Sequence, residues 1–281
     1  MVPKKTAALT MLRGDELFLR KWVEYYGAQL GRENLYIYFD GLDQKVPAFC
    51  KGCHTGKIEH LSLPVSAGDR RRITYLSERA AELFAQGYEM VIGTDVDEFL
   101  IVDPALGMSL PEFLSSVKTC RTCISGLGID VGQNTRAEGP LDPEKPFLAQ
   151  RRYAKLSTRY SKASVLLQPC TWGSGFHRVR GKNFRIEEGL YLFHFGSADL
   201  SILKAKMSDS EKLTEGWEHH LNKRNGTIML ASTATPKDWR KATAFARYCQ
   251  NLIRPPHMWN KPAMFEMKIL VEIPSRFSGI V

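Results

Sequence analysis

Residues 89–100, EMVIGTDVDEFL, contain two aspartates that could bind a metal ion. Asp95 and Asp97 stand one residue apart, directly after an apolar run that is typical of a buried strand. Carboxylates are hard oxygen ligands that suit Mg²⁺ and Mn²⁺, and such an ion can bridge the phosphates of a nucleotide. The pattern therefore indicates a site for a metal ion and a nucleotide, although two exposed acids that cap a turn would show the same spacing.

Alternating strands and helices would bring this acidic pair to the edge of a sheet. Strands are predicted at residues 6–12, 34–39, 58–63 and 89–94. One amphipathic helix begins after Gly14 and ends at Gly31, and a second begins at Asp69 and ends at Gly87. In sheets built from such βαβ units, ligands bind at the carboxyl ends of the parallel strands. We therefore expect the site in the loops that follow Leu12, Phe39 and Thr94.

The second half of the chain shows a weaker pattern. A capping box at Ser109 and Glu112 predicts a short helix, and further strands are expected at residues 123–131, 165–167 and 189–195. Residues 133–150 contain Pro and Gly without periodicity, whereas residues 201–222 and 236–252 have a helical pattern. The chain is thus expected to be one α/β domain followed by a helical extension.

Composition and charge describe an ordinary globular protein with an anionic partner. Hydrophobic residues make up 43% of the 281 residues, and no apolar run is long enough for a membrane span. The formal net charge is +9, and residues 151–185 contain many Lys and Arg but no Asp or Glu. A nucleotide diphosphate, a nucleic acid or an anionic membrane could match this charge, and a solvated basic face would also explain it. Six cysteines without a secretory signal favour a reducing, cytoplasmic location.

Several segments of the first half resemble a known family. Residues 11–16 (MLRGDE), 18–26 (FLRKWVEYY), 35–41 (LYIYFDG) and 95–99 (DVDEF) are similar to motifs of bacterial family 2 glycosyltransferases and their relatives with a GT-A fold. The resemblance covers residues 6–135 and is weak afterwards. The loop after Phe39 is shorter than the family's usual loop, which leaves the contact to the donor base open.

The resemblance implies roles for individual residues. Asp40 would face the base or ribose of the nucleotide, and Arg13 would flank the donor. Asp95 would contact the ribose or the metal, and Asp97 would bind the metal. Similar enzymes carry a lysine before an apolar strand, which selects Lys162 as a contact to the donor, with an ordinary surface lysine as the alternative.

Two further side chains complete the predicted site. His194 ends an apolar run, and similar GT-A enzymes bring a late histidine to the metal or the acceptor; neutral imidazole is a competent ligand for Mn²⁺. If the reaction inverts the anomeric centre, a carboxylate must remove the proton of the acceptor hydroxyl. Asp130, at the end of a predicted strand, is the first choice for this base among the acids that follow Asp97.

Two functions of other classes fit parts of the pattern less well. A nucleic-acid-binding protein would use the basic stretch and its interleaved aromatic residues, but no nucleic-acid-binding motif accompanies them. An Asp-x-Asp phosphatase would place its acidic pair on the first strand of the fold rather than the fourth. The pairs Cys50/Cys53 and Cys120/Cys123 could bind zinc, but their separation is too long for a zinc knuckle, so free thiols are expected.

The sequence therefore predicts a metal-dependent glycosyltransferase of GT-A-like α/β fold, with a mostly parallel mixed sheet flanked by helices. We expect Mn²⁺ or Mg²⁺ as cofactor, a UDP- or GDP-sugar as donor, and a glycan or lipid hydroxyl as acceptor, with no nucleic-acid partner. Residues 1–135 would bind nucleotide and metal, residues 136–235 would form the acceptor half, and residues 236–281 would form a helical appendage. That appendage, rich in Arg, Trp and Met, could bind peripherally to an anionic membrane, or it could simply pack on the domain.

Overall fold

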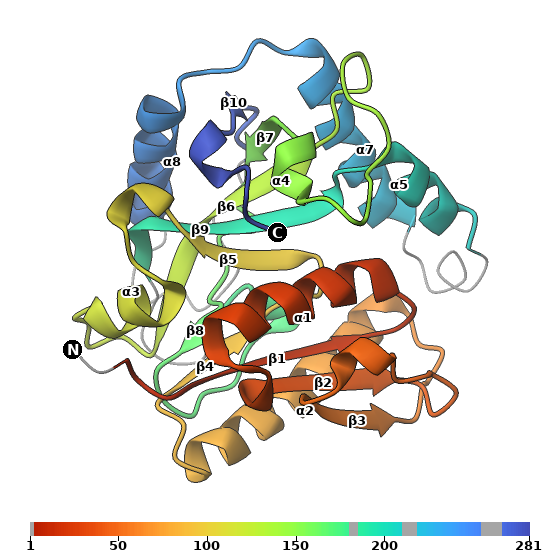
Figure 1. Ribbon diagram of the computed structural model, residues 1–281, viewed down its shortest axis with the longest axis vertical. Helices are drawn as coiled ribbons and strands as arrows, with labels where there is room; N and C mark the ends of the chain where they lie inside the picture. Colours follow the sequence, from red (N-terminus) through yellow and green to blue (C-terminus); the bar gives the residue numbers. More distant parts are fainter. Residues whose placement is uncertain (1–2, 180–184, 210–217, 254–265) are drawn as a thin grey trace.

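A ten-stranded mixed sheet forms the centre of the protein (Figure 1). The computed structural model describes residues 3–179, 185–209, 218–253 and 266–281. The strands of the sheet are β1 (Thr6–Leu12), β2 (Leu35–Asp40), β3 (His54–Ile58), β4 (Met90–Gly93), β5 (Glu98–Val102), β6 (Cys123–Gly132), β7 (Tyr153–Leu156), β8 (Val165–Leu166), β9 (Arg185–Ser197) and β10 (Leu270–Glu272). Their main order is β10-β7-β6-β8-β4-β1-β2-β3, and β9 pairs with both β5 and β6.

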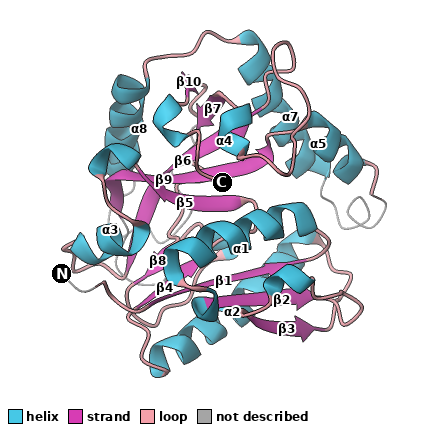
Figure 2. Cartoon of the chain, viewed as in Figure 1, coloured by secondary structure: helices cyan, strands magenta, loops and turns pink. Residues whose placement is uncertain are grey.

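Helices flank this sheet, and short 3₁₀ turns connect some of the elements (Figure 2). The α-helices among the described residues are α1 (Glu16–Leu30), α2 (Val65–Ala85), α3 (Leu110–Ser116), α4 (Phe147–Gln150), α5 (Leu200–Met207), α7 (Glu218–Thr233) and α8 (Trp239–Ile253). The 3₁₀ turns are η1 (Arg32–Asn34), η2 (Ala48–Cys50), η3 (Pro104–Leu106), η4 (Ser174–Phe176) and η5 (Ser275–Phe277). No described helix has the length and apolar character needed to cross a bilayer. The fold class predicted from the sequence, α/β with helices around a mixed sheet, is confirmed.

The N-terminal half contains the parallel part of the sheet. Strands β3, β2, β1 and β4 lie side by side and parallel, so their carboxyl ends meet at one edge. Figure 1 shows α1 in front of these strands and α2 behind them. Because helices cover both faces, every residue of β1 is buried, as expected for a central parallel strand. The loops after β1, β2 and β4 therefore converge, as the sequence predicted.

The C-terminal half is built around the long strand β6. All ten residues of β6 are buried, and the strand pairs antiparallel with β7 and β8 and parallel with β9. Strand β9 also pairs antiparallel with β5, which follows the acidic pair directly. Glu98 lies opposite His194 in that ladder, and Asp130 lies opposite His194 in the β6–β9 ladder. The register of β5, β6 and β9 thus gathers residues from three distant parts of the sequence.

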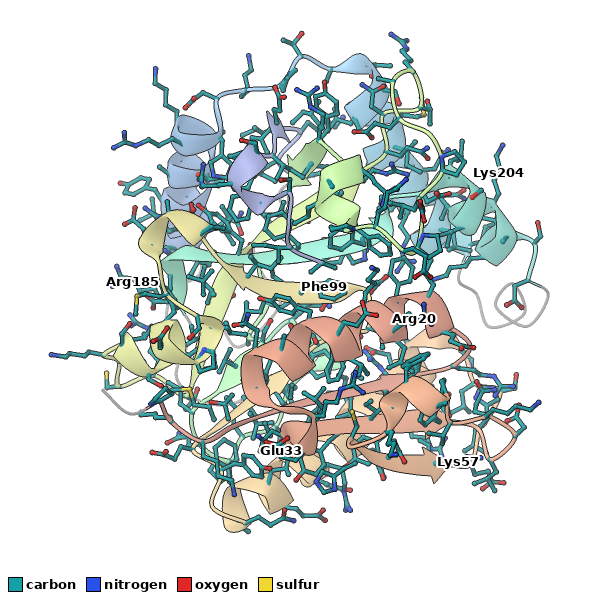
Figure 3. The ribbon with its side chains drawn as sticks, viewed as in Figure 1. Arg20, Glu33, Lys57, Phe99, Arg185 and Lys204 are labelled. Atoms are coloured by element: carbon teal, nitrogen blue, oxygen red, sulfur yellow. The ribbon has the colours of Figure 1, made fainter. Side chains whose placement is uncertain are left out.

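The interface between the two halves is aromatic. Phe99 of β5 is fully buried, and the rings of Tyr25, Tyr26 and Phe195 pack around it. In Figure 3 Phe99 lies between β5 and α1, whereas Lys57, Arg185 and Lys204 lie toward the edges of the molecule. Burying such rings contributes about 1.5–3 kcal/mol each to stability. Strand β5, which directly follows Asp95 and Asp97, is therefore firmly packed against α1 and β9.

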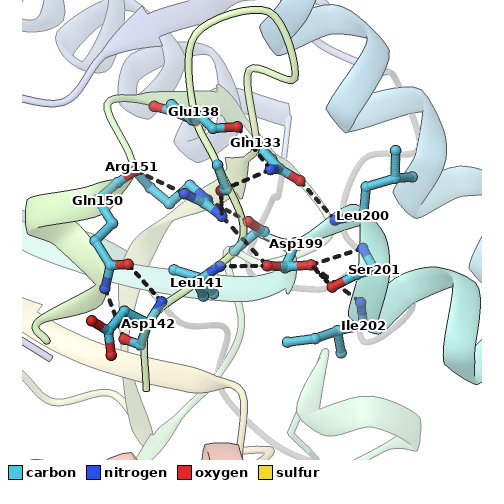
Figure 4. A network of polar contacts seen from close by, with 12 residues as sticks. Gln133, Glu138, Leu141, Asp142, Gln150, Arg151, Asp199, Leu200, Ser201 and Ile202 are labelled. Atoms are coloured by element: carbon cyan, nitrogen blue, oxygen red, sulfur yellow. Dashed lines mark hydrogen bonds and ion pairs between the residues drawn. The ribbon is translucent and has the colours of Figure 1, made fainter. Parts of the chain in front are cut away.

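A buried polar network fastens the irregular segment 133–150 (Figure 4). Arg151 is only 1% exposed; its guanidinium donates to the carbonyls of Ala198, Gln150 and Gly139 and lies 3.6 Å from the carboxylate of Asp199. Asp199 also caps α5 by accepting from the backbone of Ser201 and Ile202. A buried charge is stable only when it is hydrogen-bonded, as this guanidinium is. Arg151 therefore holds the fold together and is not part of a solvent-exposed basic face.

Some predicted element boundaries are wrong. The third strand was expected at residues 58–63 but spans residues 54–58, because main-chain pairing with β2 places a largely polar edge strand there. The helical pattern expected over residues 201–222 corresponds to two helices, and α7 continues to Thr233. Residues 210–217, between these helices, and residues 254–265 of the predicted Arg-, Trp- and Met-rich tail lie outside the described residues.

The segment after residue 235 was predicted to be a helical appendage, but it also contributes a strand and an ion pair to the fold. Strand β10 pairs antiparallel with β7 and extends the sheet. Arg276 donates two hydrogen bonds to the carboxylate of Asp103, at the end of β5. The predicted domain boundaries remain a prediction, but this last segment is joined to the sheet by strand pairing and by an ion pair.

Candidate functional site

The acidic segment connects β4 to β5 at the carboxyl edge of the parallel strands. Helix α1 holds it from one side: the indole of Trp22 donates to the hydroxyl of Thr94 at 3.0 Å, and the Leu100 amide donates to the Tyr26 hydroxyl at 2.9 Å. Tyr25 donates to the carbonyl of Leu100 at 2.7 Å. The aromatic side chains of segment 18–26 thus have a structural explanation, because they fix both ends of the segment that carries Asp95 and Asp97.

Three carboxylates of this segment form a compact cluster. Asp95, Asp97 and Glu98 each present an oxygen, and these oxygens lie within 4.8 Å of one another. Asp97 and Glu98 are buried and Asp95 is partly exposed. Like charges this close repel one another unless a cation lies between or beside them. Positively charged side chains of the protein surround the cluster and compensate part of this repulsion.

Lys162 and Arg72 neutralise one side of the cluster. The ammonium of Lys162, only 2% exposed, lies 3.0 Å from Asp95 and 2.5 Å from Glu98. Arg72, on α2, contacts the other oxygen of Asp95 at 2.6 Å and is itself held by Asp69. Lys162 is therefore buried beside the acidic pair and is no ordinary surface lysine. Its contact with the donor stays a prediction.

These contacts shift the pKa values of the cluster in opposite directions. Burial alone would raise the pKa of Asp95, but the charges of Arg72 and Lys162 outweigh it and hold the pKa well below its usual range. Burial raises the pKa of Glu98 to about 7; Lys162 opposes the rise, and the neighbouring charge of Asp95 adds to it. The site thus combines an ionised Asp95 with a Glu98 that keeps its proton to a higher pH than an ordinary glutamate does.

Asp97 points to the other side of the cluster, toward His194. The carboxylate of Asp97 lies 3.5 Å from Nε2 of His194 and 3.4 Å from the guanidinium of Arg224. Burial would raise the pKa of Asp97, but the charge and hydrogen bond of His194 and the charge of Arg224 lower it far below its usual range. Asp97 is therefore an ionised carboxylate in a buried site.

The orientation of His194 is fixed from behind. Nδ1 of His194 lies 2.7 Å from one oxygen of Asp130, and the other oxygen of Asp130 accepts from the hydroxyl of Thr227 at 2.6 Å. The ring of Tyr160 stacks on the imidazole with 3.7 Å between centroids. When a neutral imidazole donates Nδ1–H to a carboxylate, the lone pair is on Nε2, which in His194 faces Asp97. Metal-binding histidines usually have this arrangement.

A second polar cluster lies at the ends of β1 and β2. The guanidinium of Arg13 donates to the carbonyl of Asp40 and to the carboxylate of Asp43, at 3.0 and 3.1 Å. The carboxylate of Asp40 contacts Nδ1 of His60 at 2.8 Å. The two predicted nucleoside contacts, Arg13 and Asp40, are thus neighbours at this edge.

The structure brings most of the predicted residues together. Asp95, Asp97, Lys162, His194 and Asp130 form one continuous network of contacts. Arg13 and Asp40 meet each other in the second cluster instead. Their predicted contacts with the nucleotide donor stay predictions.

Sequence reasoning did not assign several residues of the site, namely Arg72, Glu98, Tyr160, Arg224 and Thr227. Glu98 could have been found, because it adjoins Asp97 in the motif, and Arg72 belongs to an Arg triplet at the start of a predicted helix. Arg224 and Thr227 gave no signal, since the helix that carries them includes Gly226 and was not predicted beyond Asn222.

No protein-family model matches the chain, and no curated protein matches it. Solved structures with some likeness include a protein of Desulfovibrio desulfuricans G20 provisionally described as a nucleotide-diphospho-sugar transferase, at 12% identity and a TM-score of 0.26. That match covers 46% of this chain and 59% of the other, so it spans less than two thirds of that protein's length.

Two further structures match over longer stretches. One is mannose-1-phosphate geranyltransferase from Thermus thermophilus, at 12% identity and a TM-score of 0.27, over 79% of this chain and 68% of the other. The other is residues 1–349 of TarS from S. aureus in complex with UDP, at 7% identity and a TM-score of 0.33, over 80% of this chain and 70% of the other.

Proposed function

We propose that the protein is a metal-dependent glycosyltransferase of the GT-A type, related to family 2, which transfers a sugar from a nucleoside diphosphate to a hydroxyl of a glycan or lipid. The observation that carries the proposal is the cluster of Asp95, Asp97 and Glu98 at the carboxyl edge of the parallel strands, with His194 beside it. Ligands of open α/β sheets bind at that edge. A UDP- or GDP-sugar is the expected donor.

The chemistry of the side chains fits Mn²⁺ or Mg²⁺. Three carboxylate oxygens within 4.8 Å of one another suit a hard divalent cation, and the imidazole of His194 favours Mn²⁺. Asp130 fixes His194 so that Nε2 faces Asp97. We propose Asp95, Asp97 and His194 as the ligands, with Glu98 close by. A cation bound there would supply positive charge to offset the charge that develops on a departing diphosphate.

Basic side chains around the cluster would share the binding of the diphosphate. Lys162 contacts Asp95 and is buried, whereas Arg224 contacts Asp97 and is partly buried. Lys206 of α5 lies 2.6 Å from Asp15, which lies in the loop after β1. Basic groups in a partly buried site interact more strongly with phosphate than exposed ones do. We propose that Lys162, Arg224 and Lys206 hold the phosphates.

The remaining predicted residues fit other parts of the same proposal. Arg13 and Asp40 are proposed to bind the nucleoside end of the donor, with His60 orienting Asp40. Asp130 is only 5% exposed, and its two oxygens contact His194 and Thr227. These contacts favour a positioning role for Asp130 over the predicted role of general base, since a base must reach the acceptor hydroxyl.

A thermal-shift experiment tests the proposal. UDP-, GDP- and dTDP-sugars are added with and without Mn²⁺ to the intact chain and to Asp97→Asn. We expect one nucleotide sugar to raise the melting temperature only with Mn²⁺, and Asp97→Asn to weaken this binding by more than about tenfold because a ligand is lost. Glu144→Gln, which removes an exposed acid outside the cluster, should bind like the native chain.

Two outcomes would contradict the proposal. Stabilisation by oligonucleotides alone, with strong dependence on salt, would indicate a nucleic-acid-binding protein. Release of inorganic phosphate that Asp95→Asn abolishes would indicate a phosphatase that uses Asp95 as nucleophile.

A further inference from the structure

Helix α8 has two apolar faces, and only one of them packs against the protein. Trp239, Ala242, Ala246 and Gln250 are buried where the helix contacts β6, β9 and β10. The rings of Tyr191 and Phe277 surround Trp239 at centroid distances of 5.2 and 5.5 Å. This face explains why the helix is fixed to the domain, and Figure 1 shows α8 at the outer edge of the C-terminal half.

The opposite face exposes large apolar side chains. Phe245, Tyr248 and Leu252 are 57%, 68% and 68% exposed. Their spacing of three and four residues places them in a single row along the helix. Single exposed apolar residues are common, but an aligned row that includes two aromatic side chains is typical of an interaction surface.

The charged side chains of the helix itself are all basic. Residues 239–253 include Arg240, Lys241 and Arg247 and contain no Asp or Glu. Lys241 lies one turn before Phe245 and so continues the row, whereas Arg240 and Arg247 lie on an adjoining face. The nearby Glu188 pairs with Arg247 at 3.0 Å. At the start of the helix the exposed Asp238 accepts from the backbone amide of Lys241, and the side chains of Arg240 and Lys241 are exposed beside it.

We propose that this face of α8, defined by Lys241, Phe245, Tyr248 and Leu252, docks on an anionic membrane surface. Phe245 and Leu252 would enter the boundary between headgroups and acyl chains, the hydroxyl of Tyr248 would stay at headgroup level, and Arg240 and Lys241 would contact lipid phosphates. A second copy of the chain is a poorer partner, because an isologous contact through this face would bring identical basic side chains together.

Vesicle co-sedimentation tests the docking surface. The intact chain is mixed with vesicles of phosphatidylcholine alone or of phosphatidylcholine with phosphatidylglycerol. We expect binding to the anionic vesicles only. Replacing Phe245, Tyr248 and Leu252 together by Ser should lower the partition coefficient more than about tenfold. Arg240→Gln and Lys241→Gln should each lower it about fivefold, with less effect at high salt.

Matched controls distinguish docking through this surface from nonspecific hydrophobic binding and from an effect of misfolding. A variant with Ser at three other exposed apolar positions should bind vesicles like the native chain; those positions are Leu42, Leu61 and Met229. Thermal melts and manganese-dependent nucleotide binding should be unchanged in the α8 variant, so that its result is independent of the proposed transferase activity.

Three results would overturn the proposal: no binding to anionic vesicles, equal binding by the α8 variant, or a dimer in light scattering that the α8 substitutions convert to a monomer. The last would show that the face joins two copies of the chain.

Discussion

His194 is the residue where the chemistry of the site can be tested most directly. Burial would lower the pKa of its imidazole, but the charge of Asp97 and the hydrogen bond with Asp130 outweigh this effect and raise the pKa above the ordinary value of 6.5. The same nitrogen, Nε2, is the proposed metal ligand and the atom that faces Asp97. Protons and metal ions therefore compete for one position.

Without metal, the protonated form of His194 stabilises the fold. Because the pKa is raised on folding, this stabilisation is complete below about pH 6.5 and is lost as the pH rises through the higher pKa of the folded state. The melting temperature of the native chain should therefore exceed that of His194→Gln most at low pH, in buffer with a chelator. Melts of both proteins between about pH 5.5 and 9, on either side of the ordinary histidine pKa, measure this difference.

With Mn²⁺ present the dependence should reverse, because the metal binds only the neutral imidazole. The increase in melting temperature caused by Mn²⁺ should grow with pH in the native chain and stay nearly flat in His194→Gln. A difference between the two proteins that does not change with pH, with or without metal, would show that Nε2 neither titrates in this range nor binds the ion.

For single residues, the sequence predicted those site residues that are recognised by their type and by their spacing along the chain. Asp95 and Asp97 were identifiable because two carboxylates directly after an apolar run seldom serve the packing of a core, and the structure places them in one cluster. The partner of His194 was not identifiable, since Asp130 is brought to it by strand register over 64 positions of sequence. Contacts of this kind follow from tertiary packing alone.

At the scale of elements, helix α1 acts as the support of the acidic segment. Trp22 and Tyr26 are fully buried and bond to both ends of the segment between β4 and β5. Their rings also pack on each other, at 4.9 Å between centroids. A metal site needs ligands held within a fraction of an ångström, which loops rarely achieve without such support.

Tyr26→Phe tests this support. The substitution leaves the buried amide of Leu100 without its acceptor, which should cost about 1–3 kcal/mol of unfolding free energy. It should also reduce the stabilisation by Mn²⁺ and nucleotide, because β5 would no longer be tied to α1 at this point. Tyr75→Phe, on α2, is the control. Full stability together with full metal response in Tyr26→Phe would show that packing alone positions the segment.

Elements with one clear hydrophobic pattern were predictable. The short strands β5, β7 and β10 were not predicted, and two further errors have clear physical causes. Strand β3 is an edge strand whose His54 stacks on Tyr36 of β2, so cross-strand contact rather than apolar alternation defines it. Helix α7 runs through Gly226, a poor helix former, because it packs closely on β6: a side chain at Gly132 would come within 2.9 Å of the Thr227 carbonyl. Both segments are shaped by neighbours that lie far away in the sequence.

For the whole molecule, the continuous sheet makes the last residues of the chain part of the core. Phe277 is fully buried, and its ring packs on Tyr191, Phe193 and Trp239 at centroid distances of 5.4 to 5.8 Å. Strand β9, which carries Tyr191 and Phe193, also pairs with β5 and β6. The C-terminal segment is thus coupled to the strands that carry Glu98, Asp130 and His194.

Phe277→Ala should therefore destabilise the entire chain in a single transition. Removing a fully buried ring costs about 3–5 kcal/mol, through lost burial and the cavity that remains. In urea, tryptophan fluorescence and far-ultraviolet circular dichroism should shift together to a lower midpoint, because one cooperative unit unfolds. Ser278→Ala, at the exposed neighbouring position, should leave the midpoint unchanged. If instead an early step appears in one probe only, while nucleotide with Mn²⁺ still protects the remainder, the C-terminal segment folds independently of the site. In that case the strand pairing of β9 would not couple the two halves energetically.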